Sequence, residues 1–160
     1  MSKVKTTLKR FSYLRDYEVL CDVNIKTKQG EHIIDYLMIG AFGVLSICFF
    51  DEKGELYGNE NDESFVIVDR KMNRIKTENL IKKAKADANA LRYVITDAKL
   101  YNVKIDSVVV VDDKRCQPLF SGAGTAVVKL SALSKFLNQE KFDIDNKTQT
   151  NEIVSLLTDK

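Results

Sequence analysis

The sequence predicts an α/β domain in which a mixed central β-sheet is flanked by helices. Two neighbouring runs, 31–39 and 44–50, are dense in Ile, Val, Leu and Phe, as expected of strands buried on both faces. Apolar residues then recur at helical spacing from Leu80 to Ala98, and a β-branched run over 105–111 follows. Buried strands that alternate with an amphipathic helix are typical of α/β proteins.

The N-terminal half is expected to contain one short helix and several strands. Residues 1–15 carry apolar side chains three and four positions apart, which predicts a helix. Gly40 and Gly43 frame a turn, so the two apolar runs should form a central hairpin. The segment 51–63 is acidic and contains Gly54 and Gly58, and no strand is predicted within it. The predicted strands in this half are 17–28, 31–39, 44–50 and 64–69.

The C-terminal half is expected to begin with the long helix, capped by Thr77. Strands follow over 105–111 and 126–130, and Ser131 should open a second helix. Ile153, Leu156 and Leu157 predict a terminal helix within a C-terminal extension over about 141–160. A length of 160 residues suits a single domain, 1–160.

Composition excludes several kinds of chemistry. The three cysteines are far apart and have no metal-binding spacing, so they are interpreted as reduced, buried thiols. His32 is the only histidine, which leaves little material for a zinc site or a Ser-His-Asp triad. The first ten residues lack the order of a signal peptide, so a cytoplasmic location is expected. The uncharged run 36–50 is too short for a membrane span.

Basic residues are concentrated in two segments. Residues 1–15 hold five bases and no acid, and residues 70–85 hold seven bases against Glu78 alone. Such clusters can contact phosphates, so DNA or RNA is the expected ligand class, although a solvated helix face would have the same composition. The candidate contacts are Lys9, Arg10, Arg70, Lys71, Lys82, Lys83 and Lys85.

Three stretches of the chain follow a recognisable pattern: YEVLCDVNI from Tyr17, IIDYLMIGAFGVLSI from Ile33, and GELYG from Gly54. They resemble the nuclease-related domain family, called NERD, a branch of the PD-(D/E)xK nuclease superfamily. The resemblance extends from about Tyr17 to Leu137, and its most specific part is the I-D-x-L-x-I-G-x-x-G-V core. It implies a restriction-endonuclease-like core and a metal-dependent nuclease site.

The resemblance also fixes a register for that site. The family pattern continues with an I-E-T-K segment, and glycines follow six and ten positions after its Glu. Gly54 and Gly58 lie six and ten positions after Cys48, which places Cys48 at the family's Glu and Phe50 at its Lys. Strand alternation puts positions 48 and 50 on one face and would direct Asp51 to the other. The triplet Asp51-Glu52-Lys53, which spells an acid-x-Lys motif, is therefore interpreted as a charged turn.

The predicted site has lost two of its three working groups. Phosphodiester hydrolysis normally uses Mg²⁺ held between carboxylates together with a nearby lysine. Asp35 offers one hard oxygen ligand, Cys48 offers a soft sulfur, and Phe50 carries no charge. No cofactor is expected, and Mg²⁺ or Mn²⁺ would bind at Asp35 only if the site is active. Asp35 is either a remnant of the site or a structural hydrogen-bond acceptor.

Two further positions depart from the family pattern. The first helix has no acidic residue, since residues 1–15 contain neither Asp nor Glu. The segment N-L-I-K-K from Asn79 resembles the family's N-P-x-x-Q segment, with Lys83 in place of its Gln. Lys83 is interpreted as a solvated helix lysine, with a relocated catalytic lysine as the alternative.

Three hypotheses follow. The leading one is a catalytically inactive domain that binds nucleic acid or acts in regulation. The second is an active metal-dependent nuclease that uses Asp35, Asp51 or Glu52, and Lys53 or Lys83. The third is a protein-interaction module, whose protein partners the sequence does not identify. Cleavage with added metal ions separates the second from the others, and salt-dependent DNA binding separates the first from the third.

Overall fold

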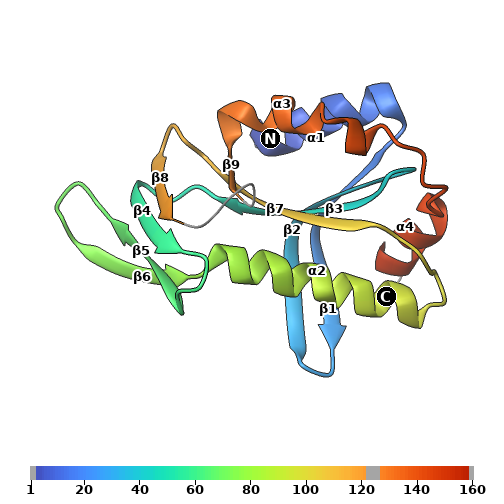
Figure 1. Ribbon diagram of the computed structural model, residues 1–160, viewed down its shortest axis with the longest axis horizontal. Coiled ribbons are helices and arrows are strands. Elements are labelled where there is room, and N and C mark those ends of the chain that lie inside the picture. The colour runs from blue at the N-terminus through green and yellow to red at the C-terminus, as the bar shows by residue number, and fades with distance from the viewer. Residues whose placement is uncertain (1–2, 122–126, 159–160) are drawn as a thin grey trace.

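The computed structural model describes residues 3–121 and 127–158 of the chain and contains two β-sheets (Figure 1). The first sheet has five strands in the order β1-β2-β3-β7-β9, and the second has four in the order β6-β5-β4-β8. Strands of the first sheet are β1 (Glu18–Thr27), β2 (Gly30–Gly40), β3 (Gly43–Phe50), β7 (Ile105–Val111) and β9 (Val127–Lys129). Strands of the second are β4 (Gly54–Asn59), β5 (Ser64–Val68), β6 (Arg74–Glu78) and β8 (Cys116–Ser121).

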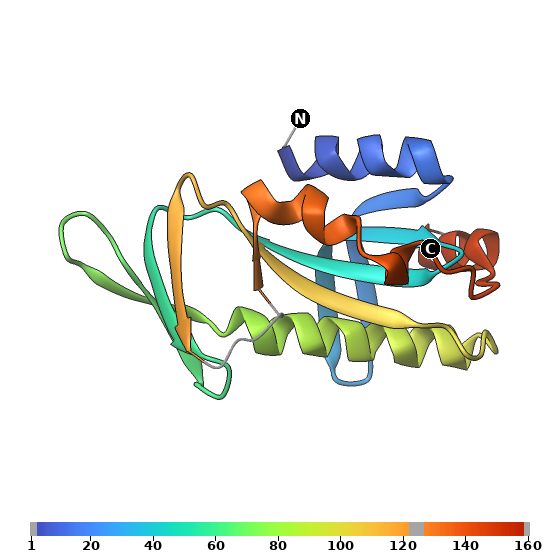
Figure 2. The same cartoon turned by 45° about the horizontal axis from the view of Figure 1, so that its top comes forward.

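Helices cover both faces of the first sheet, and Figure 2 shows the two layers. Helix α1 (Lys3–Arg15) and α3 (Leu133–Leu137) pack on one face, where Leu45 and Ile47 of β3 join their hydrophobic cluster. Helix α2 (Leu80–Asp97) and α4 (Thr150–Thr158) pack on the opposite face, against Val44 of β3. Short 3₁₀ turns are formed by Leu130–Ala132 and Glu140–Phe142. The sheets mix parallel and antiparallel pairs, so the predicted α/β class with a mixed sheet flanked by helices is confirmed.

Two strand pairs pass together from the first sheet to the second. β3 pairs in parallel with β7, and their continuations β4 and β8 pair in parallel with each other. At the crossing, the Asp112 N–H donates to the Phe50 carbonyl at 2.9 Å, and the Gly54 N–H donates to the Arg115 carbonyl at 3.1 Å. A third hydrophobic cluster spans the junction and contains Phe50 of the first sheet and Phe65 of the second. The sheets therefore share part of their core.

Three strands, β4, β6 and β8, lie where the sequence did not predict them. The acidic segment 51–63, in which no strand was predicted, contains β4, and Leu56 of this strand is fully buried. The glycines that made it look like a turn are required by packing, because a Cβ at Gly58 would overlap the Phe65 ring. Strand β8 contains Pro118, which has no N–H to donate but is tolerated because β8 is an edge strand.

The start of the long helix also differs from the prediction. Thr77 does not cap it, because residues 74–78 form β6 and the helix begins at Leu80. The cap is Asn79, whose Oδ1 accepts hydrogen bonds from the N–H groups of Ile81 and Lys82 at 3.0 and 3.1 Å. Its Nδ2 donates to the carbonyls of residues 60 and 62, which ties the β4–β5 turn to the helix. The helix itself and its apolar stripe are as predicted.

Candidate functional site

Asp35 lies where β2 separates from β3. The last paired residues of the two strands are Tyr36 and Ile47. Beyond them, Oδ2 of Asp35 accepts a hydrogen bond of 2.8 Å from the backbone N–H of Phe49. The carboxylate thus occupies the place of a strand partner for β3. This contact makes Asp35 a hydrogen-bond acceptor within the fold, one of the two interpretations drawn from its sequence position.

Several groups influence the charge on Asp35. Burial raises the pKa of this carboxyl group, and the nearby carboxylates of Asp87 and Asp22 act in the same direction. The hydrogen bond from Phe49 and the positive charge of Lys83 lower the pKa, but the net shift is upward. A carboxylate with this shift is less readily ionised than one in water.

Cys48 and Phe50 face the interior. Their side chains are 3% and 7% exposed, and both belong to the hydrophobic cluster at the junction of the two sheets. Burial raises the pKa of the Cys48 thiol to about 12, so this sulfur stays protonated at neutral pH. As predicted, the two side chains share one face of β3. That face is packed with apolar groups rather than open to a ligand.

Lys83 is held in place from two sides. Its Nζ donates to Oδ2 of Asp87 at 2.7 Å and to the Ile33 carbonyl of β2 at 3.1 Å. Asp87 is 2% exposed, and its other oxygen, Oδ1, lies 3.4 Å from Nδ1 of His32. Burial opposes the charge on Lys83, but the bond to Asp87 leaves the lysine with a raised pKa. The interpretation of Lys83 as a solvated helix lysine is therefore wrong.

Lys83 also influences the candidate site itself. Its charge lowers the pKa of both Asp35 and Cys48, which shows that the ammonium group lies within electrostatic range of each. Lys83 thus reaches β2 from helix α2 through its contact with the Ile33 carbonyl, whereas position 50 on β3 holds Phe. The primary role visible in its contacts is charge balance for the buried Asp87.

The cavity beside Asp35 has a volume of about 610 Å³, and Lys5 of α1 is among its lining residues. Asp51 also lines this cavity, and the expectation that its carboxylate is directed away from Asp35 stays a prediction. The lining residues are Lys5, Cys21, Asp22, Asp35, Tyr36, Phe49 and Asp51. Even so, among the described residues no three His, Cys, Asp or Glu side chains are grouped closely enough to hold a metal ion.

The triplet Asp51-Glu52-Lys53 forms the connection between β3 and β4, so its interpretation as a charged turn is confirmed. Nε of Arg115 donates to the Asp51 carbonyl at 2.8 Å and fixes this turn. Lys53 lines a different cavity from Asp35. The triplet is therefore divided between two cavities and does not form one catalytic unit.

The pattern at this site has a counterpart among known proteins. Residues 2–112, well over half of the chain, match the family model described as a nuclease-related domain. The chain belongs to the nuclease-related domain family. The match runs from α1 through β7 and so includes Asp35, Cys48, Phe50 and Lys83. A comparison with curated proteins found no match.

Within this NERD domain the donor set does not fit Mg²⁺. Asp35 supplies one carboxylate, of which one oxygen already accepts the Phe49 N–H. The protonated sulfur of Cys48 is a poor ligand for a hard cation, and Phe50 offers none. No catalytic step through a metal ion is supported by these residues.

The basic residues predicted to contact nucleic acid do not form one surface. Lys9 and Arg10 belong to α1, whereas Lys82 and Lys85 belong to α2 on the opposite face of the first sheet (Figure 2). Arg70 and Lys71 lie in the β5–β6 turn and line a cavity of about 700 Å³ at the junction of the two sheets. The structure therefore separates the predicted contacts into three groups.

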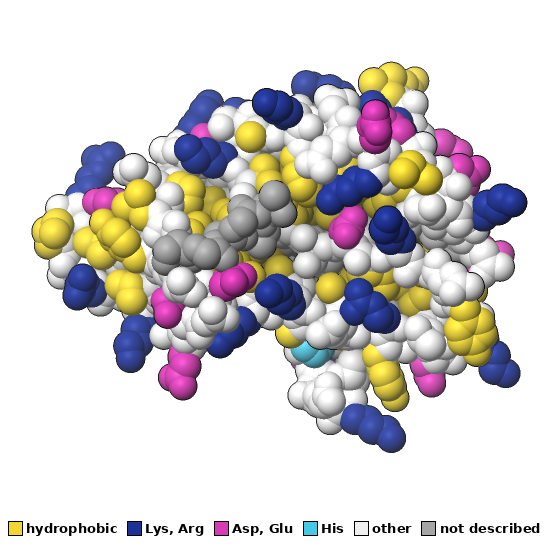
Figure 3. All heavy atoms as spheres, in the orientation of Figure 1, with side chains coloured by type: hydrophobic (Ala, Val, Ile, Leu, Met, Phe, Trp, Pro, Cys, Tyr) yellow, Lys and Arg dark blue, Asp and Glu magenta, His cyan; other side chains and the backbone are white. Residues whose placement is uncertain are grey.

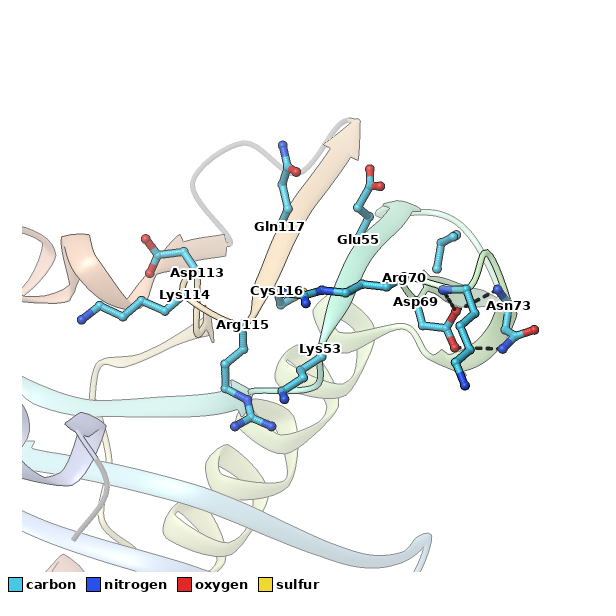
Figure 4. Close-up of a pocket in the computed structure, with 13 residues that line it drawn as sticks. Lys53, Glu55, Asp69, Arg70, Asn73, Asp113, Lys114, Arg115, Cys116 and Gln117 are labelled. Atoms are coloured by element: carbon cyan, nitrogen blue, oxygen red, sulfur yellow. Dashed lines mark hydrogen bonds between the residues drawn. The ribbon is translucent and has the colours of Figure 1, made fainter.

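Three further bases line that junction cavity: Lys114 and Arg115, which sequence reasoning missed, and Lys53, which it named only as a candidate catalytic lysine. Figure 4 shows Lys53 and Arg115 projecting from neighbouring turns. The acidic composition of 51–63 and the acids at 112 and 113 hid them, because a sequence does not show which turns meet in space. The pairing of β4 with β8 brings these turns together, but β8 was not predicted from the sequence.

Of the helices in the described part of the chain, none has the length and apolar character needed to cross a membrane.

Proposed function

We propose that this NERD domain binds nucleic acid through phosphate contacts and does not cleave it. The observation that carries the proposal is the packing of Cys48 and Phe50 into a hydrophobic cluster, at the two positions that the sequence resemblance assigns to the family's Glu and Lys. A nuclease stabilises the charge that develops on the phosphoryl group. The two positions that would do this contribute a protonated thiol and a hydrocarbon ring.

The fold around Asp35 and the basic side chains near it support nucleic-acid binding as the function of the domain. The strands, the α2 helix and Asp35 persist, and basic side chains surround the junction cavity. Phosphate contacts need positive charge and accessible side chains but no metal ion. Binding without cleavage is therefore compatible with the residues present.

A cleavage assay tests the proposal. The purified chain is incubated with single-stranded and duplex DNA and RNA in Mg²⁺, Mn²⁺ or EDTA, with Asp35→Ala as a control. We expect no hydrolysis above background in any arm, because losing such groups costs at least a factor of about 1000 in rate. We also expect binding in EDTA that weakens as salt is raised.

Two outcomes would contradict the proposal. Metal-dependent cleavage that disappears in Asp35→Ala would show a site rebuilt from Asp35 and its neighbours, such as Asp51, in the same cavity. Absence of binding to every nucleic acid at low salt would instead favour a protein-interaction module.

A further inference from the structure

The junction between the two sheets holds a concentration of positive charge. Its cavity, here called the junction groove, is lined by the turns β3–β4, β5–β6 and β7–β8. Each turn contributes at least one base. The basic lining residues are Lys53, Arg70, Lys71, Lys114 and Arg115 (Figure 4). Three turns that are distant in sequence thus each contribute basic residues to the lining of one groove.

The acids of the groove are bonded to their own neighbours. Asp69 accepts from the N–H groups of Lys71 and Asn73, each at 2.9 Å, and from Asn73 Nδ2 at 3.1 Å. Asp113 accepts from the N–H and hydroxyl of Ser131 at 3.0 and 2.6 Å. Among the described residues, no acid forms an ion pair with the five bases of the groove. The acids organise the turns, and the cations remain available to an anion.

The groove opens onto the solvent-exposed face of the second sheet. Glu55, Val68 and Gln117 line the groove, and strand alternation places Tyr57 on the same face one step further along β4. Tyr57 is 41% exposed, and its hydroxyl donates to Oε2 of Glu55 at 2.8 Å, which holds the ring in place. Figure 3 shows hydrophobic side chains gathered at this end of the molecule, with Lys and Arg around them.

The neighbours of Tyr57 complete a surface suited to an unpaired base. Val66 of β5 lies directly opposite Tyr57, and Leu119 of β8 lies on its other side. Arg74 of β6 is close enough to influence the Tyr57 hydroxyl, and Lys76 lies across from Val66. An exposed aromatic ring flanked by aliphatic and basic side chains is typical of surfaces that stack nucleobases.

We propose that the junction groove and the Tyr57 face together bind single-stranded nucleic acid, with phosphates among the turn cations and a base stacked on Tyr57. The proposal rests on the proposed function and specifies its site and ligand. Lys53 and Tyr57 are four residues apart, about 13 Å along a strand, so a few successive nucleotides reach both. A duplex would offer phosphates but would keep its bases away from the ring.

The test measures binding of the full chain to labelled oligonucleotides of about 20 residues, as single-stranded DNA, single-stranded RNA and duplex DNA. Two variants probe the two parts of the site. The groove variant combines Lys53→Ala, Lys71→Ala and Lys114→Ala, which are all exposed positions. The charge-matched control combines Lys26→Ala, Lys28→Ala and Lys104→Ala, which are exposed positions outside the groove and the second sheet.

We expect the groove variant to flatten the salt dependence of single-strand binding by about 2 in the log–log slope, since each lost phosphate contact removes about 0.7. The control variant should change that slope far less. Tyr57→Ala should weaken single-strand binding about 5- to 150-fold, whereas Tyr57→Phe, which keeps the ring, should bind like the parent. The DNA and RNA arms then identify which single strand is preferred.

Each contrary result has its own meaning. If the chain binds but the groove variant matches the control, the site lies elsewhere, and this inference fails while the proposed function stands. If duplex binds as tightly as single strands and Tyr57→Ala has no effect, the assignment to single strands fails. If the parent chain binds nothing at low salt, the proposed function fails as well.

Discussion

At the scale of single residues, the carboxylate of Asp35 has a structural task that does not depend on catalysis. Its Oδ2 accepts the Phe49 N–H at the point where β2 leaves β3. An amide oxygen could accept the same hydrogen bond without carrying a charge. Substituting Asp35 by Asn therefore keeps the hydrogen-bond acceptor and removes the negative charge.

We predict that Asp35→Asn leaves the free energy of unfolding at pH 7 unchanged or raises it. Asp35→Ala should lower this free energy by about 1–3 kcal/mol, because the Phe49 N–H loses its hydrogen-bond acceptor. The pKa of Asp35 is raised in the folded state, so its carboxyl group stabilises the fold fully at pH values below the pKa that it has in the unfolded chain. This stabilisation is lost as the pH rises through the pKa of the folded state. Any advantage of Asp35→Asn should therefore shrink toward pH 3. Denaturant titrations at several pH values measure this. A greater loss in Asp35→Asn than in Asp35→Ala would show that the fold needs the charge.

A second prediction concerns Lys83, whose ammonium group balances the buried Asp87. Lys83→Ala should lower the free energy of unfolding by about 3 kcal/mol, because it leaves a buried carboxylate without its cation. Lys85→Ala, an exposed neighbour on the same helix, should change it by less than about 0.5 kcal/mol. Thermal or chemical unfolding compares the two. Equal losses of stability in the two variants would show that Lys83 behaves like an exposed surface lysine.

At the scale of elements, strands with strong composition signals were predictable, whereas β4, β6 and β8 were not. β3 is an apolar run interrupted only by Ser46, and β7 ends in four valines, so their burial could be read directly. β4 was hidden because Gly58, which in sequence favours a turn, is required by the Phe65 ring. β8 was hidden by Pro118, whose tolerance depends on an edge position that no local pattern reveals.

The start of α2 provides a test at this scale. Asn79→Ala should lower the free energy of unfolding by about 2 kcal/mol, because the helix loses its cap and the β4–β5 turn loses its donor. Thr77→Ala, at the position that the sequence favoured as the cap, should have an effect below about 0.5 kcal/mol. Asn79→Asp keeps the acceptor and removes the donor, so its stability should fall between those of the parent and Asn79→Ala. An equal loss of stability in Thr77→Ala and Asn79→Ala would show that Thr77 caps the helix, as the sequence predicted.

At the scale of the whole molecule, the two sheets are joined by the hydrophobic cluster that contains Phe50 and Phe65. Neither sheet can separate without exposing that cluster to water. The candidate site shows the same dependence on tertiary structure. The sequence placed Asp35, Cys48 and Phe50 on their strands, but the contacts of Lys83 depend on how α2 lies against β2. Those contacts, and the meeting of three turns in the junction groove, follow from packing between distant segments.

We therefore predict that Phe65→Ala destabilises both sheets together, by about 3–5 kcal/mol. Hydrogen exchange should report the same loss of protection in β3 and β5. Tyr57→Ala, on the exposed face of the same sheet, should cost less than about 1 kcal/mol and keep protection in both. Loss of protection confined to the second sheet in Phe65→Ala would show that it unfolds as a separate unit.

The paired crossing of strands between the sheets also bears on how the chain folds. Residues of β3 pair with residues 61 positions later in β7, and those of β4 with residues 62 positions later in β8. Neither pair is local, so the chain must close a long loop before any of these parallel bonds form. The nearly equal separations mean that one closure brings both pairs into position. Formation of the β3–β7 pair is therefore expected to be slow, on a timescale of about milliseconds to seconds, and to draw β4 and β8 together in the same event.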